Sequence, residues 1–229
     1  MVCMLIFLYT KDEMSYDQFH ENKAHLYHII QTFHHGKDPE QTLGITNAIV
    51  GESIVKEVPE VEQFVRITGE DVTIKKGTDV LNENPLFVDD NFFSVFTFPL
   101  LKGNKITALK DLHSVVLSKD FANKYFGSTD IIGKTIQLKL NDEFEAFTVT
   151  AISDNAPQNS TLKTSILLPF KYYENYNSNK GWFGGSLHTL TTNVVTPSVL
   201  RFVAVSHNFS SSTKEKVVSA ENKRERHWQ

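Results

Sequence analysis

Residues 114–127 read SVVLSKDFANKYFG, in which a short apolar strand leads directly into a helix. Ser114–Leu117 is rich in β-branched residues and predicts the strand. Ser118 is a preferred N-cap residue, and Lys119–Phe126 predicts the helix that follows it. Gly127 suits the left-handed conformation in which many helices end. This stretch therefore predicts a fold that mixes strands and helices.

Further strand patterns follow on the carboxyl side. Lys134–Leu140 and Phe144–Ile152 alternate apolar and polar residues on either side of an Asn141-Asp142 turn. Period-two alternation around such a turn predicts two strands. Ser165–Phe170 predicts another, so the middle of the chain is expected to be rich in β-structure.

The amino-terminal side predicts helices before strands. Apolar residues recur mostly at three- and four-residue spacing over Ser15–Phe33, which indicates one amphipathic helix or two short ones. One apolar stripe over Asn47–Val58 indicates another helix. Val61–Thr68 and Asp71–Lys76 then alternate around Gly69, which predicts a β-hairpin.

A phenylalanine-rich segment follows these strands. Residues 85–103 read PLFVDDNFFSVFTFPLLKG, with a short strand, a polar turn at Asp89 and Asp90, and a run of aromatic residues. We expect these aromatic side chains to lie in the core because large apolar side chains stabilise a fold most when they are buried.

The first nine residues, MVCMLIFLY, are apolar and uncharged, and Lys11, Asp12 and Glu13 follow almost at once. A membrane-spanning helix needs about 20 apolar residues, so this run is too short for one. We interpret it as the outer end of a transmembrane helix that begins upstream. An ordinary first strand of the core remains the alternative.

Composition limits the classes of function. Hydrophobic residues make up 40% of the chain and charged residues 22%, as in folded globular proteins. The net charge of −4 gives no basic surface for phosphate backbones, so no nucleic acid is predicted as a partner. The single cysteine, Cys3, excludes an internal disulfide and a cysteine-based zinc cluster.

A glycine-rich segment, GSTDIIGKT at Gly127–Thr135, resembles a phosphate-binding loop but does not satisfy its geometry. Five residues separate its glycines instead of four. It also follows a predicted helix and precedes a predicted strand, which is the reverse of the order that aims a helix N-terminus at phosphate. We therefore interpret it as a helix cap and a turn.

Other chemistry-bearing residues also lack a supporting pattern. No HExxH or GxSxG motif is present, Asp89, Asp90 and Glu143 fall in turn-rich contexts, and Asn159-Ser160-Thr161 is a commonplace glycosylation match. The candidate metal ligands are five clustered histidines, His20, His25, His28, His34 and His35. A metal-dependent enzyme built on them is one hypothesis. The favoured prediction is no catalytic residue, no cofactor site and no metal site.

Several blocks together resemble the MacB-like permeases of the FtsX family of ABC transporters, of the type common in the Bacteroidetes. The blocks cover roughly residues 9–170 in the order expected for that family's periplasmic core domain. They are YTKDEMSYDQFHENKAHLYHI at 9–29, PEVE at 59–62 with Arg66, FVDDNFFSVFTFPLLKGN at 87–104, ALKDLHSVVLSKDFANKYFG at 108–127, IGKT at 132–135 and APQNS at 156–160.

The resemblance implies an α+β fold with two lobes, a membrane-proximal mixed lobe and an inserted β-rich lobe. It implies a periplasmic domain of an inner-membrane permease that is not an enzyme and that transmits ATP-driven conformational change. The partners implied are a cytoplasmic ABC ATPase subunit or domain, a second permease copy, a periplasmic membrane-fusion protein and an outer-membrane channel. A periplasmic ligand-binding or sensing module is the alternative function.

These expectations divide the chain into three parts. Residues 1–9 are expected to end the first transmembrane helix, and residues 10–185 to form the MacB-like periplasmic core domain. Residues 186–229 depart from the family pattern, because serine and threonine become dense and periodicity fades. This tail is expected to be disordered or foreign to the domain.

Overall fold

A computed structural model of the protein describes residues 2–33, 41–44, 46, 48–140, 143–176, 191–195, 202–207 and 217–220. The chain divides into two units. The first consists of Met1–Ala24 and Ile67–Ser178, and the second consists of His25–Arg66 and Asn179–Gln229. The predicted mixture of helices and strands is confirmed. The membrane-proximal and inserted lobes remain a prediction.

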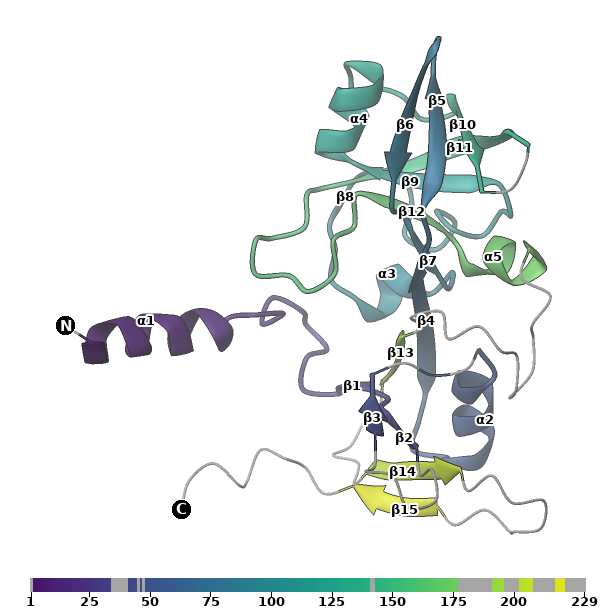
Figure 1. The fold of residues 1–229 in the computed structure, drawn as a ribbon. Helices are drawn as coiled ribbons and strands as arrows, with labels where there is room; N and C mark the ends of the chain where they lie inside the picture. The colour runs from purple at the N-terminus through teal and green to yellow at the C-terminus, as the bar shows by residue number, and fades with distance from the viewer. Residues whose placement is uncertain are drawn as a thin grey trace. The chain divides into compact units, whose positions relative to one another are not determined.

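The first helix, α1, spans Val2–Glu13 and includes nearly all of the apolar run (Figure 1). The alternative of a first core strand is therefore wrong. Within the described ranges, no helix has both the length and the apolar character needed to cross a membrane.

The prediction of one amphipathic helix or two short ones over Ser15–Phe33 is also wrong. Residues 14–25 form successive turns, and β1 (Leu26–His28) and β2 (Gln31–Phe33) follow. Asp17 adopts a φ of 55°, which interrupts any helix at this point.

The strands of the first unit form a mixed sheet (Figure 1). Neighbouring strands run in the order β7, β12, β9, β11, β10, β5, β6, and β8 also pairs with β11. The pairs β7 with β12 and β9 with β11 are parallel, and the others are antiparallel. The strand bounds are β5 Val72–Lys76, β6 Asp79–Glu83, β7 Leu86–Val88, β8 Leu100–Lys102, β9 Ser114–Ser118, β10 Thr135–Lys139, β11 Glu145–Ser153 and β12 Ile166–Pro169.

The stretch at 114–127 folds as predicted. All five residues of β9 are buried, as expected of a strand with neighbours on both sides. The Ser118 hydroxyl accepts a hydrogen bond from the Phe121 amide and caps α4 (Lys119–Phe126). Gly127 ends the helix with a φ of 72°. The two strands predicted around residues 141–142 are confirmed as β10 and β11, although that turn lies outside the described residues.

The predicted aromatic core is confirmed. Helix α3 (Phe92–Val95) and the residues after it bury Phe92, Phe93, Phe96 and Phe98. The rings of Phe92 and Phe98 stack with an interplanar angle of 7°. Another helix of this unit, α5 (Phe170–Tyr176), follows β12.

The hairpin predicted around Gly69 is wrong. Strand β4 (Gln63–Gly69) pairs with β7, and β5 pairs with β6 instead. The β5–β6 hairpin turns at Gly77 and Thr78, where Gly77 has a φ of 63°. A two-residue hairpin turn favours glycine because it requires positive φ.

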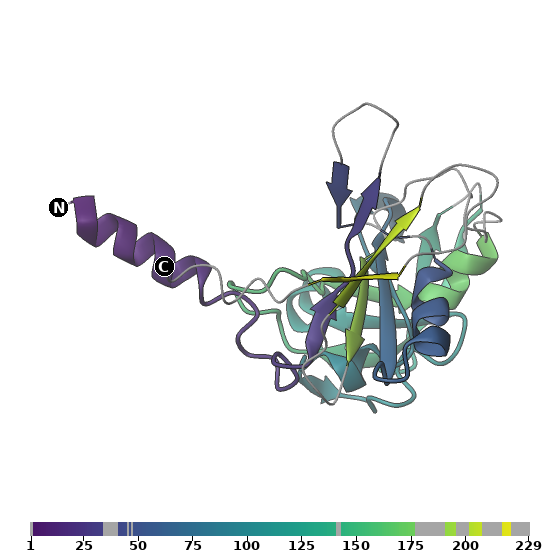
Figure 2. The same cartoon turned by 90° about the horizontal axis from the view of Figure 1, so that it is seen from below.

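The second unit contains α2 (Val50–Glu57), in the region where Asn47–Val58 predicts a helix. Strand β1 pairs antiparallel with β13 (Thr191–Val195), and these strands lie side by side in purple and yellow-green in Figure 2. A separate sheet joins β15 (Val217–Ala220), β14 (Phe202–His207), β2 and β3 (Gln41–Leu43). Most of residues 186–229 lie outside the described ranges, so the predicted disorder of this tail remains a prediction.

Candidate functional site

The segment that follows α1 is held to the first unit by contacts with two distant parts of the sequence. We call residues 15–22, together with the residues that hold them, the junction. Its partners lie at residues 94–98, which comprise the end of α3 and the segment after it, and in the loop at residues 159–161. All of these residues belong to the first unit.

The first set of contacts centres on Asp17 and Asn159. The Asn159 side-chain amide donates to the carbonyl of Ser15 at 2.8 Å, and the Asp17 amide donates to the carbonyl of Asn159 at 2.9 Å. The Asp17 carboxylate accepts a hydrogen bond from the Thr161 amide at 2.9 Å. The positive φ of Asp17 allows its amide and its carboxylate to contact the same loop.

The second set of contacts joins residues 20–22 to the end of α3 and the segment after it. The Thr97 amide donates to Nδ1 of His20 at 3.1 Å, and the Thr97 hydroxyl accepts from the Glu21 amide at 2.9 Å. The side-chain amide of Asn22 donates to the carbonyl of Val95 at 3.1 Å. Thr97 is therefore held by both its backbone and its side chain.

Aromatic packing reinforces these hydrogen bonds. The His20 ring is buried, with its centroid 5.2 Å from that of Phe96 and 5.3 Å from that of Phe98. Phe19 meets Phe98 edge to face at 5.6 Å. The junction is thus continuous with the aromatic core, and a displacement of residues 19 and 20 would have to move core side chains.

Burial lowers the pKa of His20, and the nearby Asp17 carboxylate opposes this shift only in part. Since Nδ1 accepts a hydrogen bond from the Thr97 amide, the neutral ring is the form that fits the folded protein. The unfolded chain binds a proton at this site below a pH of about 6.5. The stability that His20 contributes is therefore complete above that pH and is lost as the pH falls towards the folded pKa.

The His20→Asn variant tests this pH dependence, because the asparagine amide oxygen can replace Nδ1 as the acceptor but does not titrate. We expect the wild-type chain to lose stability relative to the variant between pH 7.5 and 5.5, by no more than about 1.4 kcal/mol per pH unit. Urea denaturation at both pH values measures this. A difference in stability that is the same at both would contradict the prediction.

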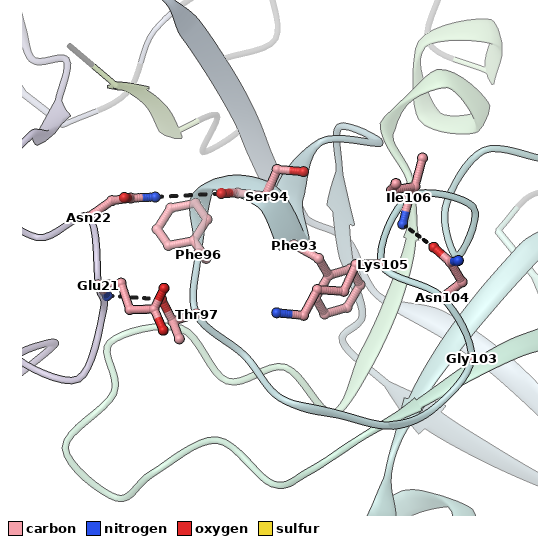
Figure 3. Close-up of a pocket in the computed structure, with 10 residues that line it drawn as sticks. All are labelled: Glu21, Asn22, Phe93, Ser94, Phe96, Thr97, Gly103, Asn104, Lys105 and Ile106. Carbon is pink, nitrogen blue, oxygen red and sulfur yellow. Dashed lines mark hydrogen bonds between the residues drawn. The ribbon is translucent and has the colours of Figure 1, made fainter. Parts of the chain in front are cut away.

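A surface cavity of about 570 Å³ lies beside the junction (Figure 3). Glu21, Asn22 and Thr97 form part of its wall. The remaining lining residues come from α3, the segment after it and the loop after β8. They are Phe93, Ser94, Phe96, Gly103, Asn104, Lys105 and Ile106.

The clustered histidines fall in different units of the structure. His20 belongs to the first unit, whereas His25 and His28 belong to the second, where Nε2 of His28 lies 2.9 Å from the carbonyl oxygen of Gly44. His34 and His35 lie outside the described residues. Among the residues that the structure describes, no group of three or more histidine, cysteine or carboxylate side chains is placed to hold a metal ion.

The glycine-rich segment at 127–135 has the predicted geometry. It follows α4 and leads into β10, with Gly127 and Gly133 at φ values of 72° and 83°. Asp130, in the middle of the segment, forms an ion pair with Lys102 at 2.8 Å, and this contact lowers the pKa of Asp130. The segment is a helix cap and a turn.

The carboxylates singled out by sequence lie in turns and loops. Asp89 and Asp90 lie in the turn between β7 and α3, and Glu143 lies in the loop before β11. Sequence reasoning missed a carboxylate at the start of β11, Glu145, which accepts a hydrogen bond from the Tyr172 hydroxyl at 2.7 Å and lies 2.9 Å from Nε2 of His113. Tyr172 and His113 lower the pKa of Glu145, so this carboxylate is already charged and satisfied.

The residues that hold the junction were also missed as a set. Only His20 and Asn159 were singled out, as a metal-ligand candidate and as part of a glycosylation match. In the structure, the Asn159 amide is occupied by its bond to Ser15. The positions of Ser15 and Asn159 differ by 144 along the chain, so no local pattern signals their contact.

Comparison with known proteins identifies one family. The family model described as MacB-like periplasmic core domain matches residues 1–206. A search of curated proteins found no match.

Three solved structures are similar in fold. A domain described as part of a permease from Porphyromonas gingivalis has a TM-score of 0.65 and 20% identity, over 80% of this chain and 78% of that chain. The extracellular domain of the ABC-type transporter YknZ from Gram-positive bacteria has a TM-score of 0.53 and 15% identity, over 76% of this chain and 84% of that chain. The periplasmic region of MacB from Actinobacillus actinomycetemcomitans has a TM-score of 0.50 and 15% identity, over 68% of this chain and 67% of that chain.

Proposed function

Because this chain belongs to the MacB-like periplasmic core domain family of ABC transporter permeases, we propose that it is a non-catalytic module that transmits ATP-driven motion to the periplasm. A separate cytoplasmic ABC ATPase hydrolyses the ATP. A second permease copy, a membrane-fusion protein and an outer-membrane channel complete the assembly. The observation that carries this proposal is the junction, which fastens an exposed apolar helix to a folded unit.

The exposed helix is α1. Its side chains from Met4 to Tyr9 are all apolar and are 49–68% exposed. Six successive residues cover every face of a helix, so this part of α1 has no polar side to turn towards water. A helix that is apolar on all sides is stable when it is surrounded by lipid or protein. We propose that α1 is the outer end of the first membrane helix of an inner-membrane permease, with the rest of the domain in the periplasm.

Vesicle binding tests this placement of α1. We expect the 229-residue chain to co-float with phospholipid vesicles, and Ile6→Asp to weaken binding at least tenfold, because a charged side chain costs about 2.5–3.5 kcal/mol in the centre of a membrane helix. Val80→Asp is the matched control, since Val80 is 60% exposed but lies on β6. Equal binding of Ile6→Asp and Val80→Asp would contradict the placement.

We propose that the junction transmits a movement of α1 to the rest of the first unit. If α1 moves when ATP binds on the other side of the membrane, the contacts of Asp17, His20 and Asn22 carry that displacement to the first unit. These contacts engage two separate loops and the aromatic core, so the helix cannot swivel freely about residue 15 while they persist. The test is whether ATP-dependent movement of the domain requires an intact junction.

A further inference from the structure

We propose that the cavity beside the junction binds a small zwitterion with an apolar side chain, such as an amino acid or a short peptide. Its volume of about 570 Å³ falls within the range of about 300–1,000 Å³ that is typical of small-molecule sites. This inference goes beyond the proposed function, because such binding requires neither ATP nor a membrane.

Two opposite charges line the cavity without pairing to each other. In Figure 3 the Lys105 ammonium points into the cavity from one wall, and the Glu21 carboxylate lies on the other wall beside Thr97. Within the described part of the chain, no ion pair or side-chain hydrogen bond engages either charge. A ligand with an ammonium group and a carboxylate can satisfy both charges at once, and charge-assisted hydrogen bonds are among the strongest that proteins form.

The cavity also offers apolar surface. The edges of Phe93 and Phe96 contribute to its wall, although both side chains are otherwise buried, with 3% and 4% exposed. Ile106 lines the same cavity and is 74% exposed. Covering these side chains with an apolar group of the ligand removes the exposed apolar surface from water.

The loop that carries Lys105 is fixed in place. The Asn104 side chain accepts a hydrogen bond from the Ile106 amide at 2.8 Å, which closes a turn around Lys105. Gly103 has a φ of 96°, and a Cβ there would approach the Cβ of Ala151 to 2.5 Å, so this loop lies directly against β11. The ammonium is therefore presented by backbone that needs little reordering on binding, which favours affinity.

Titration of the 229-residue chain with the dipeptide L-alanyl-L-phenylalanine, followed by nuclear magnetic resonance of the backbone amides, tests the inference. We expect saturable shifts of the amides at residues 94–97 and 104–106. Lys105→Met and Glu21→Gln should each weaken binding at least about tenfold, because each removes one charge-assisted contact. Acetylation of the dipeptide amine or amidation of its carboxylate should have a similar effect.

Lys110→Met is the matched control. Lys110 is exposed in the same stretch of turns but does not line the cavity. The Lys110→Met variant should bind the dipeptide as tightly as the wild-type chain does. The amide spectra of all variants establish that they are folded. The inference is overturned if no saturable shift occurs, if binding survives both substitutions, or if the doubly blocked dipeptide binds as tightly as the free one.

Discussion

Replacing Phe98 with alanine is expected to lower the free energy of unfolding by about 3–5 kcal/mol. The substitution removes a large side chain from a packed site, and the surrounding residues cannot fill the void that it leaves. The Phe98 ring is 1% exposed and stacks on Phe92. It also supports the rings of Phe19 and His20, so the same substitution should loosen the junction.

Urea denaturation measures the first effect, and hydrogen exchange of the Thr97 amide, which donates to His20, measures the second. Phe144→Ala is the control, because Phe144 is 38% exposed and its loss should cost no more than about 1 kcal/mol. If Phe98→Ala lowers the free energy of unfolding no more than Phe144→Ala does, the packing of Phe98 does not stabilise the core as we predict.

Local structure could be predicted where a short stretch determines it. Ser118 and Gly127 act on backbone groups within four residues, so the start and end of α4 follow from the sequence alone. The burial of the phenylalanines of α3 could be predicted from composition, because a dense run of large apolar side chains is unfavourable when it is exposed to water.

Structure that depends on distant partners could not be predicted. The β5–β6 hairpin had a local signal in Gly77, but Gly69 offered a similar signal, and only the pairing of β4 with β7 distinguishes them. In the same way, the apolar spacing over 15–33 favours a helix, whereas contacts with residues 94–97 and with the loop at 159–161 stabilise turns at residues 15–22.

In the candidate site, too, some features could be predicted from the sequence and others could not. Family membership could be recognised from blocks of sequence, since their order along the chain is itself the signal. The junction could not be predicted, because Asp17 has no feature in sequence that links it to Thr161. The cavity beside it likewise joins residues from three separate segments, and its two charged lining residues, Glu21 and Lys105, belong to no sequence motif.

The second large effect concerns the whole permease. The double substitution Asp17→Ala and Asn159→Ala removes the side-chain hydrogen bonds that Asp17 and Asn159 form in the first set of contacts. Bonds to charged groups contribute about 1.5–3 kcal/mol, and alanine at a left-handed position adds about 1–2 kcal/mol of strain. We therefore expect the segment after α1 to detach from the loop at 159–161 while the sheet remains folded.

Asp17→Asn is the matched control for this variant. Asparagine tolerates the left-handed conformation and keeps an oxygen acceptor for the Thr161 amide. This control should retain the hydrogen bonds of the first set of contacts, whereas the double variant should lose its side-chain hydrogen bonds and leave the second set in place. Any difference between the two then reports on the contacts and not on the charge of residue 17.

The most direct test of the account uses the full-length permease with its ATPase in lipid vesicles. A spin label replaces Thr78 at the turn of the β5–β6 hairpin, and the native Cys3 is changed to serine. Electron paramagnetic resonance measures the distance between the labels of two permease copies with and without ATP. We predict an ATP-dependent change in the wild-type protein and in Asp17→Asn, and its loss in the double variant while ATP hydrolysis continues. An unchanged response in the double variant, or no response in the wild-type protein, would contradict a junction that transmits motion.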